Sequence, residues 1–354
     1  MTDLANIVSP PQLYFLLLEF GLGLFGAWLV SRFARRLGLI DTPSARSSHI
    51  IPTPRGGGVG ILAAFIAACF WLGLNYIFCL PVVLLASLSF IGDRTDISPA
   101  MRLIMQFSAA FIVIFMLPES PLFISLPFHY LSLNWLILLM LGIMAAVFIV
   151  GTANFYNFMD GIDGIAGITA IVAMGLLTAY GISSGKDSRY TMLALGLAVA
   201  CLGFLPFNIP KAKIFMGDVG SILLGFVFAV IVVLFSLTST EFLVLSSFLF
   251  PFYADELTTM ATRIRLREDL TRPHRRHLYQ ILANEAGIAH WKVAFAYGVF
   301  QLIVGLSMWQ IARFGLVPLI GALTLLAFAT LYLTNKVRRQ FIVTKNKILL
   351  DKQR

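Results

Sequence analysis

The chain has 354 residues, of which 59% are hydrophobic and only 12% are charged, and its formal net charge is +9. Soluble globular domains are about half apolar and about one quarter charged, so this composition excludes an ordinary soluble protein. The three cysteines, Cys69, Cys79 and Cys201, lack the paired spacing of a zinc site or a disulfide framework.

Apolar runs recur along the chain, and their lengths are close to the ~20 residues that an α-helix needs to cross a bilayer. They predict an all-α polytopic membrane protein, a bundle of about eleven transmembrane helices. The predicted spans are centred in 12–30, 58–74, 78–91, 101–117, 132–150, 164–181, 191–206, 219–236, 241–259, 291–312 and 315–334. The first run follows Asp3 and no basic residue, which favours a retained span over a signal peptide.

Basic residues are distributed unevenly between the predicted loops. If the N-terminus is periplasmic, all but three of the 26 basic residues fall on the cytoplasmic side, the exceptions being Lys186, Arg189 and Arg313. The positive-inside rule therefore predicts an N-terminus outside the cell membrane and a C-terminus in the cytoplasm. The charge is explained by contact with membrane lipids, and no segment resembles a nucleic-acid-binding module.

The chain is predicted to form one membrane domain, residues 1–334, followed by a basic cytoplasmic tail, residues 335–354. A membrane anchor and a partner-binding role both stay open for this tail. Polar residues gather in five cytoplasmic segments, whereas the predicted outer loops are short and mostly featureless. Function is therefore expected on the cytoplasmic face.

The segment NFYNFMDGIDG carries Asn154, Asn157, Asp160 and Asp163 at intervals of three, directly before the sixth span. Carboxylates at the mouth of a membrane span are costly and usually mark function. Helix capping is the alternative, but it accounts for only one of the two aspartates. We therefore expect these residues to belong to a functional site.

Two further segments add carboxylates on the same side. Asp218 lies in FMGDVGS, where it could also cap the eighth span, and Asp93 and Asp96 flank Arg94 in GDRTDISP, where local ion pairs are the alternative. Carboxylates from three loops would repel one another without a cation. Oxygen ligands favour a hard ion such as Mg²⁺, which commonly shares itself with substrate phosphates.

The last cytoplasmic segment supplies positive charge. RPHRRHLYQ holds Arg272, His274, Arg275, Arg276 and His277, and arginine side chains bind phosphate in a bidentate manner. An ordinary basic inner loop would account for the arginines but poorly for the two histidines. The segment PTPRGGGVG, with Arg55, fits a turn or a close-packing site as well as a phosphate site. Together these features predict phosphoryl transfer at the membrane surface.

Five segments, in this order, resemble those of the polyprenyl-phosphate N-acetylhexosamine-1-phosphate transferases of glycosyltransferase family 4: PTPRGGGVGI, GDRTDISP, NFYNFMDGIDGIAG, FNIPKAKIFMGDVGS and RPHRRHLYQ. The resemblance implies transfer of a sugar phosphate from a UDP-N-acetyl-amino-sugar to undecaprenyl phosphate, with release of UMP. The histidine segment is most similar to the branch that starts O-antigen (lipopolysaccharide) or capsule chains.

The resemblance also implies roles for individual residues. Asp218, together with Asp163, would hold Mg²⁺, with Mn²⁺ as an alternative ion. The implied catalytic residues are Asp93, Asp160, Asp163, His274 and His277. We expect the substrates to be bound by Arg55, Asn154, Asn157, Lys213, Arg272, Arg275 and Arg276.

One position departs from the family pattern, because Gly92 stands where the family usually has the first of two adjacent aspartates. Asp93 or Asp96 could take over its role, or the ionised lipid phosphate could attack without a base. A weakened or catalytically silent relative is a further alternative, and an ion-coupled transporter is the rival class. The identity of the amino-sugar, the prenyl chain length and the choice between a monomer and a homodimer stay open.

Overall fold

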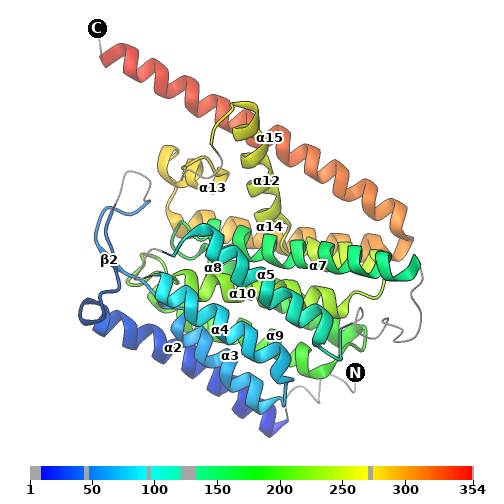
Figure 1. Ribbon diagram of the computed structural model, residues 1–354. Helices are drawn as coiled ribbons and strands as arrows, with labels where there is room; N and C mark the ends of the chain where they lie inside the picture. The colour runs from blue at the N-terminus through cyan, green and yellow to red at the C-terminus, as the bar shows by residue number, and fades with distance from the viewer. Residues whose placement is uncertain (1–8, 44–47, 94–96, 121–132, 270–273, 353–354) are drawn as a thin grey trace.

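The computed structural model describes residues 9–43, 48–93, 97–120, 133–269 and 274–352, and this part of the chain is almost entirely helical (Figure 1). The principal helices are α2 (Pro10–Leu37), α3 (Val59–Trp71), α4 (Tyr76–Gly92), α5 (Pro99–Met116), α7 (Leu133–Phe158), α8 (Ile165–Ser183), α9 (Ser188–Phe204), α10 (Asp218–Phe235), α11 (Ser239–Ser247), α12 (Phe250–Arg265), α14 (His290–Ile311) and α15 (Leu316–Lys352). Short elements are β1 (Ile40–Asp41), β2 (Thr53–Pro54), η1 (Leu205–Phe207), α13 (Leu278–Gln280), η2 (Ile281–Glu285) and η3 (Ala312–Phe314).

Eight helices of the described residues are long and apolar enough to cross a membrane: α2, α5, α7, α8, α9, α10, α14 and α15. The helices α3 and α4 are apolar but shorter, with 13 and 17 residues. The predicted all-α, multi-pass membrane protein is therefore confirmed. The number of crossings, eleven, stays a prediction.

The ninth predicted span, 241–259, is wrong as a single helix. The chain forms α11, which ends at Ser247, and then α12, which has Pro251 in its first turn. Proline fits a first turn because its missing N–H would have no partner there, whereas inside a helix it removes a hydrogen bond. In Figure 1, α12 leaves the bundle and extends toward α15.

Helix α10 forms the centre of the bundle. Of its apolar window, 83% of the residues are buried, against 6% for α15. It packs mainly against α7 and α4 (Figure 1). A Cβ atom on Gly225 would lie 2.9 Å from Cα of Ala153, so this contact depends on the absence of a side chain. Small residues at such contacts let membrane helices approach closely, and here they let α10 pack tightly against α7.

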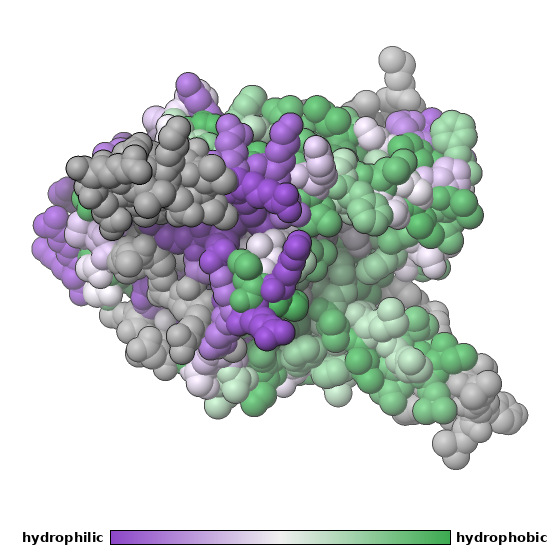
Figure 2. All heavy atoms as spheres, turned by 90° about the horizontal axis from the view of Figure 1, so that it is seen from above, coloured by the Kyte–Doolittle hydropathy of each residue, from purple (hydrophilic) through white to green (hydrophobic). Residues whose placement is uncertain are grey.

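Polar side chains are concentrated at one end of the molecule. In Figure 2 the hydrophilic residues gather toward one side of the face shown, and apolar residues cover most of the other side. Two of the three basic residues that did not fit the charge distribution have acidic partners. Lys186 Nζ lies 2.5 Å from Glu241 Oε1, and Arg189 lies 2.6 Å from Asp187 and 3.3 Å from Glu119.

Candidate active site

Side chains that are far apart in the sequence line one polar cavity of ≈ 290 Å³. Six of the predicted site residues belong to its lining: Arg55, Asp93, Asn157, Asp160, Asp218 and His274. They come from all five of the predicted polar segments, and Asn157 lies at the end of α7. The structure thus brings together three of the predicted carboxylates and one of the two predicted histidines.

A small strand pair places Arg55 at the cavity. Strands β1 and β2 are antiparallel, with Ile40 opposite Pro54. The backbone then continues beside the segment that enters α10: Phe215 N–H donates to Pro54 O at 2.8 Å, and Gly57 N–H donates to Phe215 O at 2.9 Å. Arg55 is therefore held next to the chain that carries Asp218.

The glycines that follow Arg55 serve close packing. A Cβ atom on Gly58 would lie 2.4 Å from Cα of Gly220, and one on Gly57 would lie 2.6 Å from the ring of Phe204. Such separations are far inside van der Waals contact, so only glycine fits. Of the two interpretations that the sequence left open for GGGVG, the geometry supports packing against the start of α10.

Gly217 brings Asp93 to the first residue of α10. Its φ is 78°, in the left-handed region that glycine adopts readily. A Cβ atom there would lie 2.8 Å from Oδ2 of Asp93. The backbone N–H of Asp218 donates to Asp93 Oδ1 at 3.4 Å, whereas the buried Oδ2 has no hydrogen-bond partner in the described part of the chain.

Asp218 is held by two side chains from other helices. Arg102 Nη1 of α5 lies 2.6 Å from Asp218 Oδ2. Asn157 Nδ2 of α7 donates to Asp218 Oδ1 at 3.0 Å and to Ser221 Oγ at 2.8 Å. The sequence analysis did not assign Arg102 to the site. The sign of it in the sequence was a single basic residue near the start of an apolar span.

Arg102 also accounts for the space beside Gly92. A Cβ atom added at Gly92 would lie 3.4 Å from Nη2 of Arg102. The guanidinium that neutralises Asp218 therefore also lies next to the position where the resembling family has a further carboxylate.

Two carboxyl groups of the cavity, those of Asp93 and Asp160, hold protons unusually well. Burial, and then the charge of Asp218, raise the pKa of Asp93 to about 7 against the weaker effect of Arg55. Loss of water, and then the charges of Asp218, Asp93 and Asp163, raise the pKa of Asp160 to about 7. Ionising all of these groups at neutral pH would be favoured by an added cation.

These pKa values predict how stability depends on pH without divalent metal. The folded protein binds the two protons more tightly than the unfolded chain does, so protonation stabilises the fold. Stability should therefore decrease as pH rises from the ordinary carboxyl pKa of 3.8 through about 7. The measurement is the apparent unfolding temperature in a chelator across this range. An Asp93→Asn, Asp160→Asn variant should flatten the profile, and an unfolding temperature that rises steadily with pH would contradict the shifts.

Asp255 of α12 holds the histidine segment in place. Its Oδ1 accepts from the backbone N–H of Leu278 at 2.7 Å, and its Oδ2 accepts from that of Tyr279 at 3.2 Å. The hydroxyl of Tyr297 donates to the same Oδ2 at 2.8 Å. Asp255 thereby satisfies the free N–H groups at the start of α13. The sequence analysis missed it, although two adjacent carboxylates, Asp255 and Glu256, inside a predicted apolar span were a signal.

The two predicted histidines occupy different environments. His274 lines the polar cavity, and burial, followed by His277, lowers its pKa to about 4, so the ring is neutral at pH 7. His277 is buried and is not part of that lining; its Nδ1 lies 3.8 Å from Asp255 and its Nε2 lies 3.5 Å from Glu256. The ring centroids of His274 and His277 are 4.8 Å apart. The buried ring of His277 therefore packs against the ring of His274.

Several predicted residues are not brought into this lining. Asp163 Oδ2 lies 3.3 Å from His290 Nδ1, and Asn154 exchanges amide hydrogen bonds with Gln106. Lys213 is exposed on the neighbouring loop. Arg275 and Arg276 line a different cavity. Arg272 and Asp96 lie outside the described residues.

An apolar groove of ≈ 650 Å³ meets the polar cavity at Asp218. It runs between α4, α5, α7 and α10, and its lining includes Leu85, Leu103, Val147 and Ile222. Asn157 and Asp218 belong to both linings. The site therefore has a polar compartment and an apolar compartment that share one carboxylate.

The polar cavity has ligands of the kind that a hard cation prefers. The Asp93 carboxylate lies against the first residue of α10, where its Oδ1 accepts from the backbone N–H of Asp218, and its buried Oδ2 has no partner within the described residues. Among those residues, no three His, Cys, Asp or Glu side chains form a complete metal-binding group. Mg²⁺ is usually held by only one or two carboxylates, with waters and substrate phosphates as the other ligands, so the cavity fits this ion.

Fold and site together define a polytopic membrane protein whose acidic cavity adjoins an apolar groove. Residues 75–236 match the sequence model described as Glycosyl transferase family 4, and this segment belongs to that family. It extends from α4 through the end of α10 and contains Asp93, Asp160 and Asp218.

Curated relatives agree with this assignment. The chain is 30% identical over 232 residues to the decaprenyl-phosphate N-acetylglucosaminephosphotransferase of Mycobacterium tuberculosis. This match covers 58% of the chain and 55% of the relative. It is 29% identical to the protein of the same name from Mycobacterium leprae over 76% of each chain. The undecaprenyl-phosphate alpha-N-acetylglucosaminyl 1-phosphate transferase of Haemophilus influenzae is 34% identical over 58% of this chain and 60% of the relative. The match thus spans little more than half of the first and third relatives.

Proposed function

We propose that the protein transfers an N-acetylhexosamine-1-phosphate from a UDP-sugar to undecaprenyl phosphate and releases UMP. The observation that carries this proposal is the meeting of the two compartments at Asp218. A nucleotide diphosphate-sugar suits the polar cavity, and a prenyl chain suits the apolar groove. The names of the relatives, which join a polyprenyl phosphate to a sugar phosphate, support the same pair of substrates.

The reaction forms one phosphorus–oxygen bond and breaks another. An oxygen of the lipid phosphate attacks the phosphorus that carries the sugar, and the bond from this phosphorus to the oxygen of UMP breaks. A lipid phosphate with a second pKa near 6 is largely dianionic at neutral pH and needs no base to attack. This route does not require a carboxylate at position 92, so Gly92 is compatible with activity.

The residues of the cavity position the substrates and neutralise their charge. Neutral His274 can donate a hydrogen bond to a phosphate oxygen, and Arg55 can form a charge-assisted one. Asn157 orients the Asp218 carboxylate from α7. Asp218 and Asp93 would hold Mg²⁺, which supplies charge neutralisation at the diphosphate when bound. Asp163 fits this role less well than Asp93 because it faces His290.

We place the active site on the cytoplasmic face of a bacterial inner membrane, with the N-terminus outside. The concentration of hydrophilic side chains at one end and the ion pairs of Lys186 and Arg189 support this orientation. The product, a lipid-diphosphate-sugar, would begin an O-antigen or a related envelope polysaccharide.

Filling the apolar groove should affect only the lipid substrate. Val147 of α7 lines the groove and is 55% exposed, so Val147→Trp adds bulk without disturbing the core. We expect the KM for undecaprenyl phosphate to rise about tenfold, the lower end of the effect of a misfit in an apolar pocket, while the KM for the UDP-sugar stays unchanged. Steady-state kinetics would measure both. Val317→Trp, at an exposed position outside the groove, is the matched control. An equal rise in both KM values would contradict the assignment of the groove.

The decisive experiment is UMP release by the purified protein in detergent, with undecaprenyl phosphate, Mg²⁺ and one UDP-amino-sugar at a time. Release that needs the lipid, the metal and one particular donor would establish the reaction and identify the sugar. If no donor released UMP while a Gly92→Asp variant did, the chain would be a silent relative. If neither protein released UMP, the proposed reaction would be wrong.

A further inference from the structure

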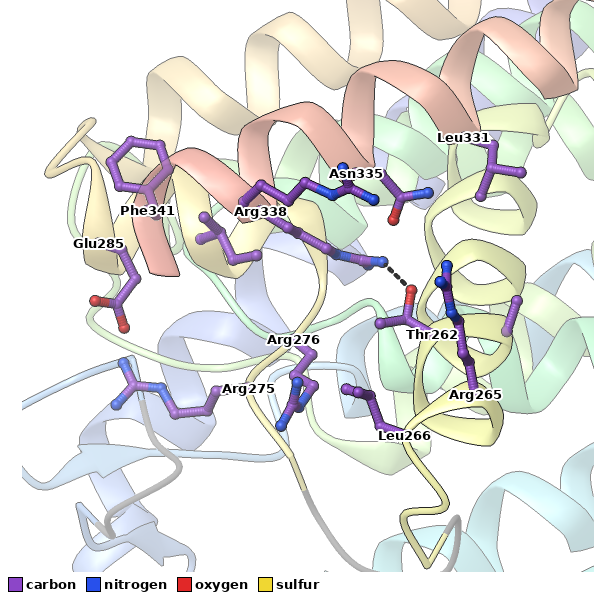
Figure 3. A pocket seen from close by; sticks show the side chains of 13 residues that line it. Thr262, Arg265, Leu266, Arg275, Arg276, Glu285, Leu331, Asn335, Arg338 and Phe341 are labelled. Carbon is purple, nitrogen blue, oxygen red and sulfur yellow. Dashed lines mark hydrogen bonds between the residues drawn. The ribbon is translucent and has the colours of Figure 1, made fainter. Parts of the chain in front are cut away.

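A second large cavity, of ≈ 830 Å³, lies on the other side of the histidine segment (Figure 3). It is lined by α12, by the segment that carries Arg275 and Arg276, by η2 and by the part of α15 between Leu331 and Phe341. It shares no lining residue with the polar cavity of the proposed active site. His274 faces one cavity and its neighbour Arg275 faces the other.

The charge of this cavity is strongly positive. Its charged lining residues are five arginines and one glutamate: Arg265, Arg275, Arg276, Arg338, Arg339 and Glu285. Arg276 is paired with Glu268, which is not part of the lining. Arg265 and Arg339 are exposed, and within the described residues neither has an ion-pair partner. Two exposed guanidinium groups of the lining are thus without an ion-pair partner in the described part of the chain and can bind an anion.

The cavity is held open by a buried arginine that joins two helices. Arg338 of α15 is 5% exposed, and its Nη1 donates to Thr258 O at 3.1 Å and to Thr262 Oγ1 at 2.8 Å. Its Nη2 donates to Thr259 Oγ1 at 2.5 Å and lies 3.8 Å from Asp255 Oδ1. Figure 3 shows this side chain reaching from α15 toward α12. The same contacts connect the cavity to Asp255, which positions the histidine segment.

The surroundings of the arginines are apolar. Leu266, Leu331 and Phe341 also line the cavity. The surface of the two flanking helices continues this character, with Ile264 of α12 at 59% exposure and Phe328 of α15 at 66%. Phe328 lies on α15, which is long and apolar enough to cross a membrane, so its exposed side chain faces the hydrocarbon of the bilayer. A soluble anion would leave this apolar surface uncovered, whereas a lipid would cover it with its acyl chains.

We propose that this cavity binds an anionic phospholipid, whose phosphate is held by Arg265 and Arg339 and whose acyl chains lie along α12 and α15. Guanidinium groups form strong charge-assisted hydrogen bonds with phosphate oxygens. Basic pockets between membrane helices on the cytoplasmic side bind anionic headgroups in this manner. The bound lipid would contact the side of the histidine segment that carries Arg275 and Arg276. It would thereby stabilise the position of His274, which lines the polar cavity on the other side of this segment.

The test uses the full chain and two probe lipids, phosphatidylglycerol and phosphatidylcholine, in native mass spectrometry of the detergent-purified protein. We expect one phosphatidylglycerol to bind more tightly than phosphatidylcholine. An Arg265→Gln, Arg339→Gln variant should weaken the binding of phosphatidylglycerol by roughly 25-fold, from about a fivefold contribution of each arginine. Both residues are exposed, so the fold should persist, and the apparent unfolding temperature checks this.

An Arg35→Gln, Arg36→Gln variant is the matched control, because it removes the same charge from exposed positions at the end of α2. It should leave phosphatidylglycerol binding unchanged, and an equal loss would show that the lipid responds only to overall charge. A further arm adds inorganic phosphate. If free phosphate displaces the lipid, or if phosphatidylcholine binds equally well, the proposal is overturned.

Discussion

Replacing Asp218 by Asn should lower kcat for UMP release by about 10²–10³-fold, the range found when one preorganised charge-stabilising group is removed from an active site. The change is nearly isosteric, so the hydrogen bond from Asn157 can persist. The negative charge that the two compartments share is lost. Arg102, which lies 2.6 Å from Asp218 Oδ2, would then carry an uncompensated charge beside the cavity. Steady-state kinetics with saturating lipid and donor would measure the loss.

The same variant should also lose its response to metal. Ligands that bind only the folded state raise its stability, so Mg²⁺ should raise the apparent unfolding temperature of the wild-type protein but not that of Asp218→Asn. Asp187→Asn is a matched control, because Asp187 also lies at a helix start and pairs with an arginine, Arg189. Its kcat should stay within about twofold, as expected for a surface ion pair. Full activity of Asp218→Asn would exclude this carboxylate from the reaction.

Hydropathy predicted most of the helices because the bilayer imposes both a length and a composition on any helix that crosses it. It failed at 241–259 for a physical reason. Averaging over a window joins the apolar residues of α11 to those at the start of α12, and the backbone break before Pro251 leaves no trace in the average. The adjacent acids Asp255 and Glu256 were the local sign that this segment differs from a simple span.

The sequence indicated several residues that line the polar cavity, but it did not indicate the side chains that contact them. Glycine, aspartate and histidine stand out in an apolar chain, so Asp93, Asp160, Asp218 and His274 could be found by type and side. The pairing of Arg102 with Asp218 could not, because it depends on how α5 and α10 lie against each other. The placement of His274 and Arg275 in two different cavities could not be predicted either. Neighbouring side chains point to opposite sides only where the backbone is extended, and the motif alone does not show the backbone conformation.

A side chain at position 217 should disrupt the site almost as severely as the loss of a carboxylate. Gly217→Ala forces a Cβ atom to within 2.8 Å of Asp93 Oδ2 and 3.0 Å of the backbone nitrogen of Gly56. It also places a non-glycine residue at a φ of 78° and a ψ of 169°, a region that is essentially restricted to glycine, which costs roughly 1–3 kcal/mol. Displacing Asp93 by about 1 Å should reduce kcat by about 10²-fold. The assay is UMP release, together with the apparent unfolding temperature.

Two comparisons separate the crowding of Asp93 from backbone strain. Gly21→Ala in α2 meets open space and has no positive φ, so it should leave activity unchanged and stabilise the helix slightly. In an Asp93→Ala background the carboxylate that Gly217→Ala would displace is already absent. The second substitution should then cost little further activity while still lowering stability, a non-additive result typical of residues in contact. Additive losses in kcat would mean that Gly217 acts independently of Asp93. The close approach of Asp93 to the start of α10 would then not be what the glycine provides.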